Sequence, residues 1–274
     1  MEVQKPSNML CSAGDIAMTL DDFLEIGRLR SRMAGYRRKL DAAIQLCAEE
    51  LQKHKYPYIS VSGGKDSVAM AYVVEEAARR TGKTYRIWCH ISDASFPGTR
   101  ETVEELCERL NRPLDLFECP YSAFEAVKDD QRARFGKTGA FYTSIREYAQ
   151  DKDLAFVGVR ASESARRLRA AKIKGQSFFS KSMGSVTVCN PLLWFRLEDV
   201  AATIAYYNAP IHPIYGKQAL ENVRNINDEE HWIRLSYVTS RDLMNMGTVM
   251  FIRANYPELY NKLAEACPDV RNYG

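Results

Sequence analysis

The chain has 274 residues and a formal charge of +3 at pH 7, with 46% hydrophobic and 27% charged residues. It is long enough for one large α/β domain with an appended helical part, and its composition is that of a globular protein. A charge so close to zero gives no overall case for nucleic-acid or membrane binding, so any basic surface must be local.

The first predicted element is an amphipathic helix over residues 20–53, which follows a weakly ordered lead-in at 1–18. Apolar residues recur in this helix at spacings of three to five, which is the helical period. Its opposite face, which we expect to be solvated, carries Arg28, Arg30, Arg32, Arg37, Arg38 and Lys39.

Strand-like and helical patterns then alternate. The strand-like segments are 57–61, 85–91, 114–118, 154–159 and 186–189, and the helical ones are 66–80, 99–111, 122–130 and 141–151. Apolar strands separated by helices predict a mostly parallel five-stranded sheet with helices on both faces. Ligands of such sheets bind beyond the carboxyl ends of the strands, where the loops 62–67, 92–98 and 160–166 begin.

The remaining chain is predicted to be helical at 191–209, irregular at 210–235, and helical again at 239–266 with breaks near Gly247 and Pro257. We therefore divide the chain into an N-terminal lead-in and helix at 1–54, a nucleotide-binding domain at 55–216, and a helical C-terminal extension at 217–274.

The seven cysteines include no Cys-x-x-Cys pair; three of them lie in or beside apolar strand-like runs and two lie in helical patterns. We expect buried, reduced thiols in a cytoplasmic protein. The sequence has no apolar run of membrane-spanning length and no signal-peptide pattern at its start, so we expect no membrane association.

The most informative segment is the loop between the first predicted strand and the next helix, which reads Ser62, Gly63, Gly64, Lys65, Asp66, Ser67. Glycines let backbone N–H groups approach a phosphate, and a helix N-terminus adds further donors and a partial positive charge. Lys65 adds a full charge. A Walker-type loop would need a glycine at Ile59 and a hydroxyl residue at Asp66, so this loop is an anion cradle of another kind.

Two further segments lie at predicted strand ends, and a third follows them in the chain. Asp93 is placed to bind a ribose hydroxyl or, together with Asp66, Mg²⁺. Arg160 is expected to point into the same crevice as Lys65, where its permanent charge suits phosphate. Glu163 would orient an arginine or bind metal, and Arg166 is a second candidate for binding the nucleotide.

Residues 169–181 combine basic residues with two adjacent phenylalanines. This composition suggests a mobile loop suited to a nucleotide or single-stranded nucleic acid. A plain surface loop with one buried ring fits the same residues as well.

Together these segments resemble the phosphoadenosine-phosphosulfate (PAPS) reductase family, within the PP-loop ATP-pyrophosphatase superfamily. The resemblance covers roughly residues 55–216. The loop 62–67 matches the Ser-Gly-Gly-Lys-Asp-Ser signature, and residues 96–101 resemble a Phe-Pro-Glu-Thr element with Gly98 in place of Glu. Residues 158–166 resemble the family's Gly-x-Arg-x-x-x-Ser element and the arginine that follows it, and residues 190–200 and 212–215 resemble the family's Pro-Leu, Asp-Val and Asn-Pro-Leu-Tyr stretches. The resemblance implies an adenine nucleotide α-hydrolase-like fold and, weakly, a homodimer.

The departures from the family bear on the reaction. The reductases carry a nucleophilic Cys in a C-terminal Glu-Cys-Gly-Leu-His motif, whereas Cys267 here lies in an unrelated context. Iron–sulfur branches carry paired cysteines after the position of Tyr215, and residues 190–266 contain no Cys. We therefore expect no iron–sulfur cluster.

Without cysteine or cluster chemistry, the reaction that the resemblance implies is cleavage of ATP between its α- and β-phosphates, with Mg²⁺ as cofactor. Residues 62–67, Asp93, Arg160 and Arg166 would bind the nucleotide, and Lys65 and Arg160 would stabilise the departing pyrophosphate. The adenylylated acceptor would be a nucleotide, a nucleic acid or a tRNA base, and a partner protein would then donate sulfur or nitrogen. Three alternatives stay open: sulfonucleotide reduction through Cys267, an adenylyltransferase resembling FAD synthetase, and a nucleotide-binding, non-catalytic subunit of a modification or defence complex.

Overall fold

The computed structural model describes residues 19–128, 140–217 and 246–273. The expected lead-in at 1–18, the expected irregular stretch from residue 218 onward and the first residues of the expected helix at 239–266 lie outside the described residues. Within the described ranges, no helix is both long enough and apolar enough to cross a membrane.

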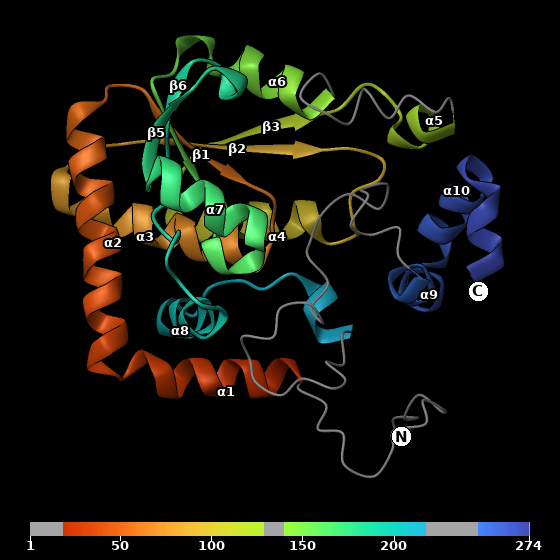
Figure 1. Cartoon of the computed structure of the whole chain (residues 1–274), viewed down its shortest axis with the longest axis horizontal. Coiled ribbons are helices and arrows are strands. Elements are labelled where there is room, and N and C mark those ends of the chain that lie inside the picture. The colour runs from red at the N-terminus through yellow and green to blue at the C-terminus, as the bar shows by residue number, and fades with distance from the viewer. Residues whose placement is uncertain (1–18, 129–139, 218–245, 274) are drawn as a thin grey trace.

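The centre of the fold is a six-stranded sheet with the order β3-β2-β1-β4-β6-β5 (Figure 1). Its strands are β1 Pro57–Val61, β2 Arg86–Ile91, β3 Leu114–Glu118, β4 Leu154–Val157, β5 Ser177–Ser180 and β6 Val186–Cys189. All neighbouring strands are parallel except β5, which pairs antiparallel with β6. The α/β class and the mostly parallel sheet are thereby confirmed.

The sheet has one strand more than predicted, because residues 169–181 are ordered as a helix and a strand. Helix α7 spans Ala165–Lys174, and β5 follows it directly. In β5, Phe178 packs against the cluster around Trp88 while Phe179 is 62% exposed. Such alternation is the strand period, but four residues are too few to reveal it in the sequence.

Helices cover both faces of the sheet, as predicted. Helices α2 (Ala34–Lys53), α3 (Lys65–Thr81) and α4 (Thr99–Leu110) lie on one face, and α6 (Ala140–Tyr148) lies on the other (Figure 1). Strand β1 contributes side chains to the apolar clusters on both faces of the sheet, since Ile59 belongs to the large cluster and Tyr58 to the smaller one under α6. Burial on both faces explains why the strands read as continuous apolar runs.

The predicted N-terminal helix is broken into α1 (Leu20–Ser31) and α2, which turn sharply between Arg32 and Met33. The break lets α1 lie along α8 (Leu197–Tyr207), and Gly27 is the point of closest approach, because a Cβ there would lie 2.4 Å from the Ala201 carbonyl oxygen. Helix α8 also begins later than the predicted residue 191, since the Asp199 side chain accepts the Arg196 N–H and caps the helix start.

The expectation that the basic face of the N-terminal helices is solvated was wrong for part of it. Arg30 and Lys39 both donate to Asp199, which is fully buried. Burial works against the Asp199 carboxylate, but hydrogen bonds from Lys39, Arg196 and Arg30 outweigh it and lower the pKa of Asp199. The carboxylate therefore ties α1 and α2 to α8.

The C-terminal helices are α9 (Met246–Asn255) and α10 (Pro257–Ala266), followed by a 3-10 turn at Pro268–Tyr273. The predicted break at Pro257 is confirmed, whereas Gly247 lies inside α9. These helices share the main apolar cluster, and the ring of Tyr256 lies 5.4 Å from that of Phe96. The remaining short helix, α5, spans Ala123–Lys128.

The described cysteines are all unpaired. Burial raises the pKa of the Cys89, Cys107 and Cys189 thiols to about 12, and Cys47 is buried as well. These thiols stay protonated at neutral pH and are poor nucleophiles. Cys267 is partly buried at the end of α10, where it packs against the main cluster.

Candidate functional site

The strand order places the two most informative loops side by side. Strands β1 and β4 are parallel neighbours, and the chain runs outward from β1 to β2 on one side and from β4 to β6 on the other. The order therefore reverses between β1 and β4, and ligands of open α/β sheets bind at such a reversal, beyond the carboxyl ends of the strands. The loop after β1 holds Ser62–Ser67, and the loop after β4 holds Arg160.

The loop after β1 is a short, tied turn that leads directly into α3. Gly63 has φ +73°, a conformation that glycine adopts without steric cost. The Ser67 hydroxyl accepts the Ser62 N–H at 3.2 Å and donates to the Gly64 carbonyl at 2.9 Å. Helix α3 begins at Lys65, so the first N–H groups of the helix face the loop without intrahelical acceptors. The predicted succession of strand, glycine turn and helix is therefore present, and anion binding by this loop stays a prediction.

Three charged side chains contact one another next to this turn. The Lys65 ammonium donates to Asp66 at 2.9 Å, and the Arg160 Nε donates to the other carboxylate oxygen at 2.5 Å. The Arg160 side chain is fully buried, and that of Lys65 is 5% exposed. Two cations face one carboxylate, so the group carries a net charge of +1. We call Lys65, Asp66 and Arg160 the charge triad.

The triad keeps all three groups ionised. Burial alone would raise the pKa of Asp66, but the charges of Arg160 and Lys65 outweigh it and hold that pKa below its usual value. Burial likewise disfavours the Lys65 ammonium, and the Asp66 carboxylate outweighs it, so the pKa of Lys65 is raised. The excess positive charge is therefore present across the whole neutral pH range.

Sequence reasoning put Arg160 in the same crevice as Lys65, and the structure brings the two together through Asp66. The guanidinium is turned toward Asp66 and the Ser162 hydroxyl, to which Nη1 donates at 3.1 Å. Glu163 accepts the Arg160 N–H at 3.0 Å and pairs with Arg167, in keeping with the expectation that Glu163 orients an arginine.

Gly158 sets how closely the two loops approach. A Cβ at this position would lie 3.0 Å from the carbonyl carbon and oxygen of Asp66 and from the Cα of Ser67. The absence of a side chain thus lets the end of β4 press directly against the start of α3. Contact between Arg160 and Asp66 depends on this approach.

Tyr215 belongs to the site, and reasoning from residue chemistry missed it. Its hydroxyl accepts the Lys65 N–H at 3.3 Å, and the Lys65 ammonium lies 5.6 Å from its ring centroid. Tyr215 comes from a 3-10 turn at Pro213–Lys217, 150 residues away in the sequence. The only sequence signal for it was the family-like stretch at 212–215.

His212, next to this turn, has a structural place. It is fully buried, its Nδ1 accepts the Ile214 N–H at 3.0 Å, and its Nε2 lies 3.1 Å from the Thr99 hydroxyl. Because that hydroxyl donates to the Phe96 carbonyl, Nε2 carries the proton and His212 is neutral. Burial lowers its pKa to about 4.

Asp93 and Arg166 lie apart from the triad's contacts. Asp93 accepts from the Ser122 hydroxyl at 2.6 Å and from the Ala123 N–H at 2.8 Å, and so anchors the start of α5. Arg166 is exposed in the first turn of α7. No hydrogen bond joins either of them to the described loop residues, so their roles in nucleotide binding stay predictions.

The donors for a metal ion are few. Among the described residues, no group of three or more His, Cys, Asp or Glu side chains could hold one. Both carboxylate oxygens of Asp66 face cations, and both of Asp93 face α5. These side chains do not fit a direct Mg²⁺ site, so any Mg²⁺ would have to enter with its polyphosphate ligand, whose oxygens it prefers.

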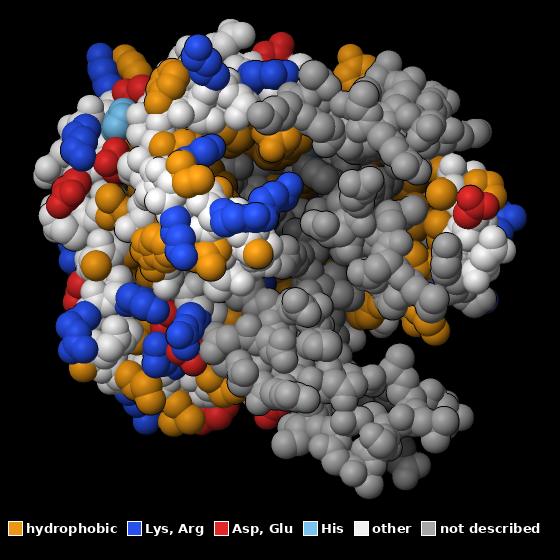
Figure 2. All heavy atoms as spheres, in the orientation of Figure 1, with side chains coloured by type: hydrophobic (Ala, Val, Ile, Leu, Met, Phe, Trp, Pro, Cys, Tyr) orange, Lys and Arg blue, Asp and Glu red, His pale blue; other side chains and the backbone are white. Residues whose placement is uncertain are grey.

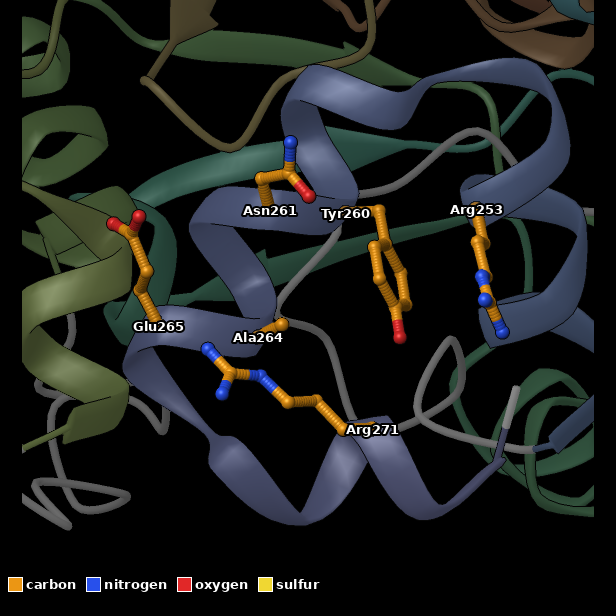
Figure 3. A pocket seen from close by; sticks show the side chains of 6 residues that line it. All are labelled: Arg253, Tyr260, Asn261, Ala264, Glu265 and Arg271. Atoms are coloured by element: carbon orange, nitrogen blue, oxygen red, sulfur yellow. The ribbon is translucent and has the colours of Figure 1, made fainter.

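A separate hollow of about 400 Å³ lies among the C-terminal helices (Figure 3). It is lined by Arg253, Tyr260, Asn261, Ala264, Glu265 and Arg271. None of these residues belongs to the loops after β1 and β4. Its lining mixes two arginines with a glutamate, and it is distinct from the candidate site.

Comparison with known proteins identifies the family of the chain. The family model described as the phosphoadenosine phosphosulfate reductase domain matches residues 56–256. A probable sulfurtransferase from Methanocaldococcus jannaschii is 31% identical over 104 residues, which are 34% of this chain and 30% of that protein. The matched part is thus less than a third of the relative's length.

Among solved structures, FMN adenylyltransferase from Candida glabrata has a similar fold. Its complex with FMN and the ATP analogue AMPCPP aligns with a TM-score of 0.51 at 16% identity, covering 73% of this chain and 70% of that one. Its complex with FAD and inorganic pyrophosphate gives the same values. At this level of identity the likeness concerns the fold alone.

Proposed function

The chain belongs to the phosphoadenosine phosphosulfate reductase domain family, and on that basis we propose that it cleaves MgATP between the α- and β-phosphates and adenylylates a second substrate. The acceptor would be a nucleotide, a nucleic acid or a tRNA base. The observation that carries the proposal is the charge triad at the reversal of strand order, where an anionic ligand of an α/β sheet is expected.

The proposed reaction follows from the placement of the charges. An oxygen or nitrogen of the acceptor attacks the α-phosphorus and forms a new bond to it. The bond from the α-phosphorus to the bridging oxygen breaks, and pyrophosphate leaves with the electron pair. The loop N–H groups and the Lys65 ammonium would bind the β- and γ-phosphates, where this charge accumulates.

Within the triad the two cations have different tasks. Lys65 lies at the start of α3 in the loop itself, keeps 5% of its side chain exposed and has a flexible stem, so it is the group that would touch the leaving phosphates. Arg160 is fully buried against Asp66, so we assign it a positioning role: it balances Asp66 and leaves the Lys65 charge available to the ligand. Removing a well-placed cationic donor typically costs roughly 2.7–4 kcal/mol of barrier.

A subsequent transfer of sulfur to the adenylylated acceptor is the second part of the proposal. It is supported by the 31% identity over 104 residues to a probable sulfurtransferase. Because that match spans 30% of the relative, the sulfur donor and any partner protein remain proposals. We place the protein in the cytoplasm on the same footing, as the compartment of reduced thiols.

The test is pyrophosphate release from MgATP with a panel of nucleotides, DNA and tRNA as acceptors. We expect acceptor-dependent release that falls by about 10²–10³ in Lys65→Ala. Lys83→Ala is the matched control, since Lys83 is an exposed lysine in the turn before β2, at the amino end of that strand, whereas the cradle follows the carboxyl end of β1. Mass spectrometry of the acceptor identifies the adduct.

Two outcomes would point elsewhere. If Lys65→Ala kept the full rate, the cradle would not be the reacting site. If MgATP bound but no acceptor gave pyrophosphate, the non-catalytic subunit would be the better interpretation. Sulfonucleotide reduction through Cys267 is tested separately, because it requires that Cys267→Ser abolish the reduction of PAPS.

A further inference from the structure

Helix α7 is the most one-sided charged element among the described residues that lie close to the charge triad. It carries five basic residues and no acidic one between Ala165 and Lys174. They are Arg166, Arg167, Arg169, Lys172 and Lys174. Soluble surfaces normally mix the two signs of charge, so a helix of one sign calls for an explanation.

The helix turns most of this charge toward solvent. Ala171 is its one buried residue and marks the side that packs on the protein. Successive residues are about 100° apart on a helix, so Arg169 and Ile173 lie opposite Ala171, with Arg166 and Lys172 beside them. Ile173 is 84% exposed. We call Arg166, Arg169, Lys172 and Ile173 the outer face of α7.

The basic side chains of the outer face are not paired with acidic side chains in the described part of the chain. Arg167 pairs with Glu163, and Lys174 lies 4.7 Å from the centre of the Phe178 ring. Arg166, Arg169 and Lys172, in contrast, form no ion pair with any described residue. Three like charges within two turns repel one another, and a polyanion would relieve this repulsion.

The outer face also lies close to the candidate site. Helix α7 begins five residues after Arg160, and Ser164 caps it, while Arg160 holds Asp66 of the loop after β1. Figure 2 shows Lys and Arg side chains gathered over the part of the molecule where Figure 1 draws α7. A long anion on this surface would therefore lie next to the predicted ATP site.

We propose that the outer face of α7 binds the phosphate backbone of a nucleic acid strand and delivers one of its nucleotides to the site beyond β1 and β4. This inference rests on the proposed function for the site that it serves, and it narrows the acceptor to a nucleic acid. A membrane surface fits less well, because a membrane-binding helix buries a broad apolar face, whereas the outer face offers Ile173 as its apolar side chain.

The experiment measures binding of labelled 20-nucleotide RNA and DNA, single-stranded and duplex, by fluorescence anisotropy without ATP over a series of salt concentrations. If Arg169 and Lys172 each contact one phosphate of a single strand, the double variant Arg169→Ala/Lys172→Ala loses about 1.4 from the salt slope and about tenfold in affinity near 0.15 M salt. The double variant Arg38→Ala/Lys83→Ala removes the same charge from exposed positions elsewhere and should bind within twofold of the wild type.

The outcomes separate this inference from the proposed function. Equal binding by the two double variants would overturn the nucleic-acid surface and leave pyrophosphate release untouched. Selective weakening in the α7 variant supports the surface even if no acceptor yields pyrophosphate, in which case the proposed function fails alone. The surface is also overturned if phosphatidylserine vesicles bind in an α7-dependent manner while none of the four nucleic acids does.

Discussion

Replacing Gly158 by alanine tests whether the contact between β4 and α3 sets the position of the loop. The new Cβ would lie 3.0 Å from three backbone atoms of Asp66 and Ser67. Carbon atoms in contact normally lie about 3.5–4.0 Å apart. The loop would therefore have to retreat by roughly 0.5–1 Å, and because the contacting atoms are backbone, no rotation of a side chain can relieve the clash.

The expected effect on stability is small, and the effect on the reaction is large. Overpacking of this kind costs about 1–3 kcal/mol, while replacing glycine restricts the unfolded chain and returns about 0.4–1 kcal/mol. The net loss should lie between roughly 0 and 2.6 kcal/mol. A displacement of about 1 Å in a reacting group, however, costs on the order of 10²-fold in rate.

Urea denaturation and pyrophosphate release, measured on the same preparations, separate the two effects. Gly35→Ala is the matched control, since a Cβ at Gly35 meets nothing within 4 Å and alanine is favoured in the helix. It should leave both measurements unchanged or raise stability slightly. A Gly158→Ala protein that released pyrophosphate at the wild-type rate would refute the argument that this contact holds the triad in place.

Two further predictions concern the N-terminal helices. Asp199→Asn should destabilise the protein by about 2–3 kcal/mol at pH 7, less than a fully buried pair would lose, because Arg30 and Lys39 are 26% and 36% exposed and can reach water. The pKa of Asp199 is lower in the folded protein than in the unfolded chain. The carboxylate therefore stabilises the protein above the unfolded pKa of about 3.9, and this stabilisation is lost as the pH falls through the folded pKa. The difference in unfolding free energy between wild type and Asp199→Asn should shrink below about pH 4 in urea denaturation, and a constant difference would contradict this assignment. Gly27→Ala should cost about 1–3 kcal/mol or more by the same measurement, because its Cβ would lie 2.4 Å from the Ala201 oxygen, and a neutral result would mean that α1 does not pack on α8 in solution.

The parts of the fold that the sequence could predict are those governed by local signals. The strand β1, the glycine turn and the helix α3 follow one another within 25 residues, and each has its own pattern of burial, backbone freedom or helical period. The parallel sheet followed from the alternation of such units. Strand β5 was not predicted, because it is set by the pairing of its four residues with β6. A pairing of this kind gives no recognisable pattern within so short a stretch of sequence.

The parts that the sequence could not predict are contacts between distant residues. Arg160 and Asp66 are 94 positions apart, and Tyr215 and Lys65 are 150 apart. An arginine at a strand end suggests phosphate binding equally well whether it faces the ligand or a carboxylate behind it. The turn at Arg32 was hidden for a related reason, since it is set by the packing of α1 on α8 rather than by a local helix breaker.

The composition of the triad indicates why an arginine occupies the buried position and a lysine the more accessible one. A buried lysine can lose its proton, whereas a guanidinium stays charged at any physiological pH. Arg160, fully buried, therefore keeps Asp66 ionised whether or not a ligand is bound. Asp66 in turn keeps Lys65 protonated. If Lys65 turned from Asp66 to a phosphate, Arg160 would still balance the carboxylate, so the protein would not be left with an uncompensated buried charge.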